Sequence, residues 1–323
     1  MGSVPVRVIA AVAALVLLGG LAIVGVLVAA RSSSSTATAT FGTTTPPPGT
    51  ETEFPAPPSG SMVFARNDGA DALALALRPE GRRLGLQASV VGGEGSGERG
   101  DSVTFSVSRR GGTVHVSAVP CGAGCYRAHA PMGSAPRAVT VKVTRGARST
   151  TWRVPIEIWP PRPAAAIVAR AERVWRGLRT FEFSERLSSS PENVVNSHWK
   201  IVAPDRLSYV IAGGGAGVIV GNHRWDRQGA RWQKRDQSPL DLPQPTWGTD
   251  GVTNAHLIGS GTIDGQPAWR VSFFDADGRA WFELMIAKRT SRTLALTMTA
   301  TAHFMHQAFS GFNAPLTVRP PAS

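Results

Sequence analysis

Four side chains near the C-terminal end of the sequence are of types that bind soft metal ions. They are Met298, His303, Met305 and His306, and thioether and imidazole groups are ligands that suit copper. On an extended strand His303 and Met305 share one face while His306 points to the other, because side chains alternate. A site built on His303 and Met305 is therefore the weaker alternative. We expect packing or surface roles for these residues, and no metal or other cofactor.

The sequence lacks the common motifs of catalysis. It has no Gly-x-Ser-x-Gly, His-Glu-x-x-His or Walker-type phosphate loop. The glycine-rich run 213–217 lies between two predicted strands, so no helix N-terminus faces a phosphate there. Asp275 and Asp277 stand in an Asp-Ala-Asp-Gly stretch that is ordinary turn chemistry. We therefore expect a protein that is not an enzyme.

The two cysteines of the chain are four residues apart, in the sequence Cys121-Gly-Ala-Gly-Cys125. The glycines permit a tight reversal of the backbone. In an oxidising compartment the pair is expected to form a small-loop disulfide. A redox or metal-binding pair is the alternative, but the spacing is not Cys-x-x-Cys and no flanking helix is predicted.

The C-terminal half contains the candidate binding residues, which are large apolar side chains that alternate with polar ones along predicted strands. A sheet of this size closes into a barrel or curls around a helix. A single amphipathic helix near Ile167–Leu178 leaves part of the apolar face uncovered, so we expect a cavity for a hydrophobic ligand. The alternative is that these side chains only pack the core. The predicted lining comprises Trp199, Ile201, Tyr209, Ile211, Trp269, Phe273, Phe282, Leu284 and Met298.

The elements that must position these residues form two modules in a mainly β chain. Residues 61–160 show period-2 alternation at intervals of about ten residues, as in Val103, Phe105 and Val107, which predicts an immunoglobulin-like antiparallel β-sandwich. Residues 161–323 begin with the helix and continue as antiparallel strands, which predicts a half-barrel sheet wrapped on that helix. The predicted strands of this second module are 181–187, 198–203, 206–212, 217–221, 231–235, 255–263, 268–275, 280–288 and 293–304.

The N-terminal part of the sequence predicts an attachment to the cell membrane. Val8 to Ala30 contains no charged or polar side chain, and at ~1.5 Å per residue it spans about 34 Å, enough for a bilayer core. We expect residues 1–31 to be an uncleaved single-pass anchor, with a long cleaved signal as the alternative. The Ser/Thr/Pro-rich residues 32–60 predict a stalk that holds the folded modules outside the cytoplasm.

The charge of the chain is strongly basic, with 34 Lys and Arg against 22 Asp and Glu. The excess is spread along the sequence and forms no long run, whereas nucleic-acid-binding proteins concentrate charge on one helix or stripe. We therefore expect an arginine-rich surface facing a membrane or cell wall, and no nucleic-acid partner.

Three stretches of the C-terminal half resemble proteins of the lipoprotein-carrier superfamily, which includes LolA, LolB, LppX and LprG. They are WKIVAPDRLSY (199–209), IVGNHRWD (219–226) and FNAPLTVRP (312–320). The resemblance covers about residues 164–320. It implies a half-barrel whose concave face, lidded by helices, holds acyl chains, and it implies no catalytic residues.

The order of the two modules resembles the extracytoplasmic tail of actinobacterial copper-resistance membrane proteins of the CopD type. The stretches that carry this resemblance are 121–126, 159–161 and 299–306. Those proteins have many membrane helices before this region, and this sequence has one predicted span. The resemblance therefore implies at most an association with copper homeostasis.

Together these features predict a membrane-anchored, extracytoplasmic, non-catalytic protein that binds a lipid or acylated ligand in its half-barrel. The alternative is an envelope scaffold or sensor that binds a protein partner, such as a membrane protein. A continuous apolar tunnel would favour the carrier, and a collapsed interior would favour the scaffold.

Overall fold

The computed structural model describes residues 55–68, 71–92, 95–97, 99–190, 193–247 and 251–322. The predicted anchor, residues 1–31, and most of the predicted stalk lie outside these residues. Within the described ranges no helix has the length and apolar character needed to cross a membrane.

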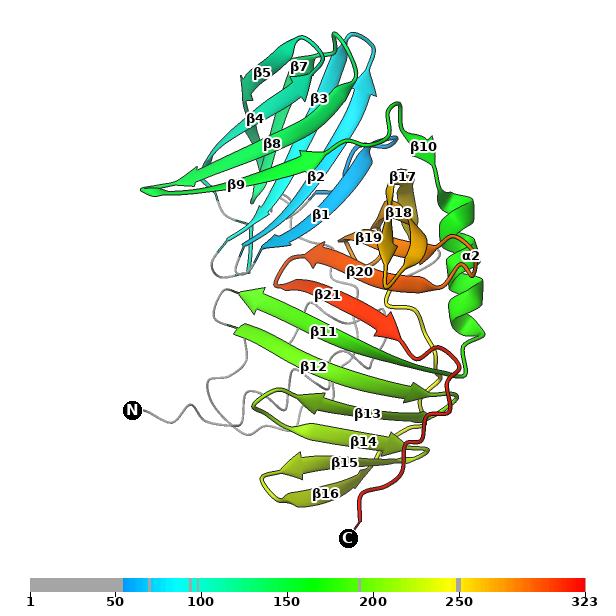
Figure 1. The fold of residues 1–323 in the computed structure, drawn as a ribbon. Helices are drawn as coiled ribbons and strands as arrows, with labels where there is room; N and C mark the ends of the chain where they lie inside the picture. The colour runs from blue at the N-terminus through cyan, green and yellow to red at the C-terminus, as the bar shows by residue number, and fades with distance from the viewer. Residues whose placement is uncertain are drawn as a thin grey trace.

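The first module is a sandwich of two antiparallel sheets (Figure 1). Alternate residues of each strand, such as Phe64, Leu75, Phe105 and Val141, are fully buried between the sheets. The strand order is β1-β2-β3-β7-β6 in one sheet and β5-β4-β8-β9 in the other, and the immunoglobulin-like type of this sandwich stays a prediction. The strands are β1 (Met62–Asp68), β2 (Asp71–Glu80), β3 (Arg83–Val91), β4 (Ser102–Arg109), β5 (Gly112–Ser117), β6 (Val119–Gly122), β7 (Cys125–Pro131), β8 (Pro136–Arg145) and β9 (Arg148–Pro155).

The second module is a twelve-stranded antiparallel sheet with one helix, and we call it the half-barrel. Its order is β10-β17-β18-β19-β20-β21-β11-β12-β13-β14-β15-β16. Two meanders, β11 to β16 and β17 to β21, are joined because β11 pairs with β21. The strands are β10 (Arg162–Pro163), β11 (Thr180–Ser190), β12 (Asn193–Val202), β13 (Arg206–Ile211), β14 (Ala216–Val220), β15 (His223–Gln228), β16 (Arg231–Asp236), β17 (Val252–Ile263), β18 (Gln266–Asp275), β19 (Ala280–Ala287), β20 (Thr293–Ala300) and β21 (His303–Ser310).

The helix α2 (Ala165–Arg176) covers one face of this sheet, which we call the inner face. Val168, Ala171 and Trp175 form the buried stripe of the helix, as expected for apolar residues repeating every three to four positions. These side chains share one core with inner-face residues from strands as far apart in the sheet as β13 and β18. The sheet must therefore curl around the helix, as predicted.

The outer face of β17 to β21 is covered by the first module. Val63 and Ala65 of β1 pack on Phe274 and Trp281 in a small buried cluster. Asn67 joins the modules by polar contacts, since its Nδ2 donates to the backbone oxygens of Met298 (3.0 Å) and Met305 (3.1 Å). The Thr299 hydroxyl donates to Asn67 Oδ1 at 2.7 Å, and the Arg66 guanidinium pairs with Glu283. The two modules thus pack on each other over the outer face of the half-barrel.

We predict that Asn67→Ala destabilises the protein by about 1–3 kcal/mol, because it leaves the fully buried Thr299 hydroxyl without a partner. The measurement is urea unfolding of the full chain. Asn196→Ala, a change to an exposed residue of β12, is the matched control and is expected to stay within about 0.5 kcal/mol of the parent. Equal losses in the two variants would contradict a joining role for Asn67.

Candidate functional site

The inner face of the half-barrel is built from aromatic side chains that the strand register places side by side. Phe183 of β11 lies opposite Trp199 of β12, which lies opposite Tyr209 of β13. The rings of Phe183 and Trp199 are stacked with centroids 5.6 Å apart, and those of Trp199 and Tyr209 are 4.7 Å apart. Offset and tilted aromatic pairs of this kind add stability beyond the area that they bury.

All nine residues predicted to line a cavity lie on this inner face. Eight of them are buried in its core, and Trp269 is partly buried against it, with Lys288 Nζ 4.0 Å from the centre of its ring. The sequence pattern therefore located the face correctly. Whether these side chains bind a ligand stays a prediction.

The open cavity expected on the inner face is not among the two best-formed hollows of the described residues. The inner-face side chains pack into one continuous core in which Phe273, Phe282 and Leu284 are almost completely buried. The two best-formed hollows of the described chain have volumes of about 40 and 20 Å³ and lie in the first module. Neither is large enough for an acyl chain.

A segment between β16 and β17 explains why the inner face is closed. β16 is one edge of the sheet and β17 is next to the other edge, so the chain must cross ten inter-strand spacings of ~4.8 Å, or about 48 Å along the sheet. About 15 residues connect Asp236 to Val252, and their full reach is roughly 50 Å. A path around the curled sheet would use nearly this whole reach, whereas a path across its inner face is shorter, and Leu240, Leu242 and Trp247 of this connection lie against the inner face.

We call residues 237–247 of this connection the strap. It has no helix or strand, but Leu240 and Leu242 pack against the inner core and Trp247 is buried within it. Trp247 meets Trp175 of α2 edge-on, with ring centroids 5.5 Å apart. Helix and strap together thus complete the cover that the helix alone does not provide.

A buried polar cluster interrupts the apolar inner face beneath the strap. Glu185 takes the inward position between Phe183 and Leu187 on β11 and is 4% exposed. Its carboxylate accepts hydrogen bonds from Gln307 Nε2 at 2.7 Å and from the Ser197 hydroxyl at 3.2 Å.

The same cluster reaches the strap and the aromatic stack. The Thr246 hydroxyl of the strap donates to Gln307 Oε1 at 3.3 Å, and Trp199 Nε1 donates to the Ser197 hydroxyl at 2.7 Å. Our sequence analysis missed this cluster. Its signal was a charged residue at an inward position of β11 and an amide at an inward position of β21, where alternation predicts apolar side chains.

Burial raises the pKa of Glu185 above its ordinary value, and the hydrogen bonds from Gln307, Ser197 and Trp199 oppose that rise. Within the described chain no Lys, Arg or His forms an ion pair with this carboxylate. A buried carboxyl group without a counter-ion is costly to ionise. Such a group either lowers the stability of the fold at this point or belongs to a binding site.

Two buried N–H groups also lie unused in this interior. The indole nitrogens of Trp175 and Trp247 are buried and have no hydrogen-bond partner among the described residues. Buried indole N–H groups usually have an acceptor. An oxygen-bearing ligand group between helix and strap would supply one.

Near the free edge of the sheet the inner face becomes polar. Tyr209 lies over Gly217, where a Cβ atom would come within 2.3 Å of its ring, so glycine is required there. The Tyr209 hydroxyl receives a hydrogen bond from Arg224 Nη2 at 3.1 Å, and Arg224 Nε donates to Asp226 Oδ1 at 2.8 Å. Burial is the main cause that raises the pKa of Tyr209. This polar group closes one end of the apolar region.

The residues of the metal alternative are divided between the two faces of the sheet. Met298 and Met305 are paired across β20 and β21 and are buried in the inner core. His306 is on the outer face, where its Nδ1 lies 3.2 Å from the Thr297 hydroxyl. Burial lowers the pKa of His303 to about 4. Among the described residues no group of three His, Cys, Asp or Glu side chains is placed to hold a metal ion.

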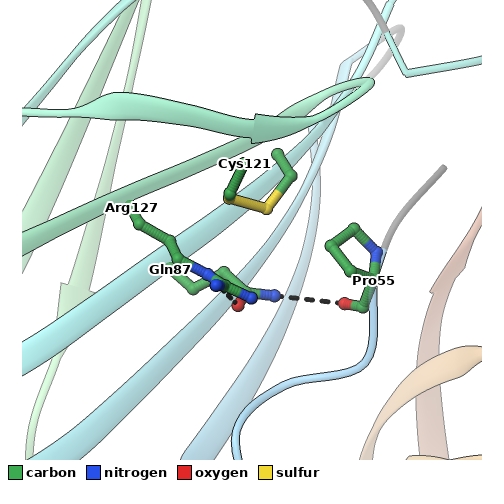
Figure 2. The surroundings of a disulfide bond; sticks show 5 residues. Pro55, Gln87, Cys121 and Arg127 are labelled. Carbon is green, nitrogen blue, oxygen red and sulfur yellow. Dashed lines mark hydrogen bonds between the residues drawn. A yellow bond between two sulfur atoms is a disulfide. The ribbon is translucent and has the colours of Figure 1, made fainter. Parts of the chain in front are cut away.

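The predicted disulfide is confirmed. Cys121 and Cys125 are bonded, with Cα atoms 5.0 Å apart, and they close the turn between β6 and β7. Figure 2 shows this bond near Gln87, whose Nε2 donates to the Pro55 carbonyl at 3.1 Å and whose Oε1 accepts from Arg127. The disulfide belongs to the first module and is not part of the inner face.

Comparison with known proteins gives similarities of fold only. No family model matches the sequence, and no curated protein matches it significantly. Solved structures similar to this one include LprF from Mycobacterium bovis (14% identity, TM-score 0.39, covering 50% of this chain and 99% of that chain). The lipoprotein LppX from Mycobacterium tuberculosis is similar at 13% identity and a TM-score of 0.37, over 48% of this chain and 97% of that one.

A DUF1329 family protein from Desulfovibrio piger is similar at 11% identity and a TM-score of 0.26, over 48% of this chain and 93% of that one. The predicted resemblance to copper-resistance proteins stays a prediction.

We predict that Glu185→Gln removes a loss of stability that the parent suffers as pH rises. Because the pKa of Glu185 is raised on folding, the folded state binds more protons than the unfolded state between the ordinary value of 4.5 and the raised value. Stability therefore falls as pH rises through this window and is not regained above it. Urea unfolding of the full chain at several pH values measures the effect.

The quantity to compare is the difference in unfolding free energy between variant and parent. The lowered pKa of His303 makes both proteins lose stability as pH falls from 6.5 toward about 4, and this effect cancels in the difference. The unfolding free energy of Glu185→Gln relative to that of the parent should increase as pH rises above 4.5. Glu182→Gln, on the outer face of the same strand, should leave the parent's decline in place. A difference between Glu185→Gln and parent that is constant with pH would refute the assignment.

Proposed function

We propose that the protein is a non-catalytic lipid-binding protein of the envelope that takes an acyl ligand onto the inner face of its half-barrel when the strap moves aside. The observation that carries this proposal is the way the inner face is covered. A large curled sheet presents one apolar surface, and part of its cover is a segment without regular secondary structure.

The strap is held by few polar contacts. Among the described residues its hydrogen bonds to other segments are those of the Gln237 N–H to the Asn222 carbonyl (2.9 Å), the Leu242 N–H to the Pro204 carbonyl (2.8 Å), Arg176 Nη1 to Gln244 Oε1 (2.7 Å) and the Thr246 hydroxyl to Gln307 Oε1 (3.3 Å). Segments with few backbone hydrogen bonds open at lower free-energy cost than paired strands. The strap is therefore the part of the cover most easily displaced.

The groups exposed by this displacement match an amphiphilic ligand. Moving Leu240, Leu242 and Trp247 would free an apolar surface for an acyl chain. The Trp175 N–H would meet an acceptor oxygen of the ligand's head group, and Glu185, when protonated, would donate to another. An acyl chain with an oxygen-rich head is thus the chemistry that this interior fits.

The location that we propose is extracytoplasmic, with residues 1–31 as a single-pass anchor. The Cys121–Cys125 disulfide supports it, because disulfides persist in oxidising compartments.

A second candidate function is that of an envelope scaffold or sensor that binds a partner on its surface. The filled interior favours it, since the closed inner face offers no preformed space. The two candidates differ in whether the strap opens to an acyl ligand.

We predict that Leu240→Ala/Leu242→Ala tightens acyl-ligand binding. Apparent affinity is the intrinsic affinity reduced by the fraction of open molecules, and these truncations weaken only the closed state. A loss of ~1.4 kcal/mol from strap packing corresponds to about tenfold tighter binding. The measurement is titration of the full chain with cis-parinaric acid, a fluorescent fatty acid.

Val116→Ala/Met132→Ala is the matched control, because these side chains are also partly buried but pack on the core of the first module. It should bind as the parent does. If neither the parent nor the strap variant binds the fatty acid, the carrier proposal is wrong and the scaffold is favoured.

A further inference from the structure

The hairpin of β15 and β16 forms the free end of the half-barrel sheet. Within the described chain no strand pairs with the far edge of β16. The first module contacts β17 to β21 through β1 and β2, at the opposite end of the sheet from this hairpin (Figure 1). The outer face of the hairpin is therefore left uncovered by the sandwich.

The register of the hairpin places two tryptophans and two cations on this outer face. Trp225 lies opposite Lys234, and Arg227 lies opposite Trp232. Side chains at directly opposed positions share a face, and so do alternate residues of one strand. We call Trp225, Arg227, Trp232 and Lys234 the edge-hairpin face.

The tryptophans of this face are accessible. Trp225 and Trp232 are both partly exposed, whereas Trp199, Trp247 and Trp281 are almost fully buried. A large aliphatic side chain extends the surface, because Val210 of β13 is on the same outer face and is 52% exposed.

The hairpin that carries the edge-hairpin face has more cations than carboxylates. Residues 223–236 contain five Arg and Lys and two Asp. One carboxylate, Asp236, lies 3.0 Å from His223 Nδ1, and the other, Asp226, pairs with Arg224 on the inner face. No carboxylate of the described residues pairs with Arg227 or Lys234, and Lys234 Nζ lies 5.7 Å from the Trp225 ring centre.

Protection of a sheet edge explains the cations of the edge-hairpin face but not its two tryptophans. Charged residues on edge strands prevent edge-to-edge association, which explains the cations. It does not explain two accessible indole rings beside them, because exposed aromatics promote association. Indole rings interleaved with Lys and Arg are typical of surfaces that lie at a membrane–water interface.

We propose that the edge-hairpin face binds the surface of an anionic phospholipid bilayer. The indole rings would insert at the level of the head groups, where one side of the ring is apolar and the N–H is hydrated. Arg227 and Lys234 would meet the lipid phosphates, with an attraction that falls as salt is raised. This inference does not depend on acyl binding by the inner face.

The test uses the full chain reconstituted by detergent removal into vesicles of brominated phosphatidylcholine, with or without phosphatidylglycerol. Bromine quenches tryptophans that enter the bilayer. We expect quenching with phosphatidylglycerol, its loss at high salt, and its loss in Trp225→Phe/Trp232→Phe. The control Trp159→Phe, a partly exposed tryptophan at the end of the first module, should keep it.

A second pair of variants keeps the test independent of the tryptophans. Arg227→Gln/Lys234→Gln should lose the extra quenching by phosphatidylglycerol, whereas Arg137→Gln/Arg153→Gln, at exposed sites of the first module, should retain it. Circular dichroism confirms that each variant is folded. Quenching that is equal in the two lipid compositions, or unchanged in both hairpin variants, would overturn the proposal and favour a protein partner on this face.

Discussion

The half-barrel depends on covering one apolar sheet face that a single helix cannot cover. α2 contributes Val168, Ala171 and Trp175 to that cover, and the rest of the inner face would otherwise meet water. Burial of apolar surface is the dominant favourable term in folding. In the sheet order, β16 is at one edge and β17 is next to the other edge, so the segment that connects them lies against the inner face. The strand order itself thus leads to the covering of the core.

That mode of closure links stability to function. The inner core is packed with aromatic pairs, and yet a carboxyl group and two unpartnered indole N–H groups lie within it. A core selected only for stability would be expected to exclude such groups. Glu185 lies beneath the strap, and Trp175 and Trp247 lie where the helix meets the strap, so opening of the strap would bring all three groups toward a ligand.

The sequence predicted those parts of the fold that rest on alternation. Strands with clean patterns, such as Trp199 and Ile201 in β12 or Phe282 and Leu284 in β19, were placed on the correct face. β15 was missed because its sequence, HRWDRQ, has one apolar residue.

The candidate site was harder to predict than the fold. Leu240, Leu242 and Trp247 lie in a proline-containing segment without periodicity, so nothing local shows that they plug the inner face. Glu185 is a single exception to an apolar pattern, and its partners Ser197 and Gln307 are brought to it only by strand pairing. Long-range pairing of this kind is not encoded in any short stretch of sequence.

Hydrogen-exchange mass spectrometry of the full chain, with and without a long-chain fatty acid, tests the central claim most directly. If the strap is a displaceable cover, peptides from residues 237–247 exchange faster than those from β11 to β13 and become less protected when the fatty acid binds. Strap peptides as protected as the central strands, and unaffected by the fatty acid, would contradict the account.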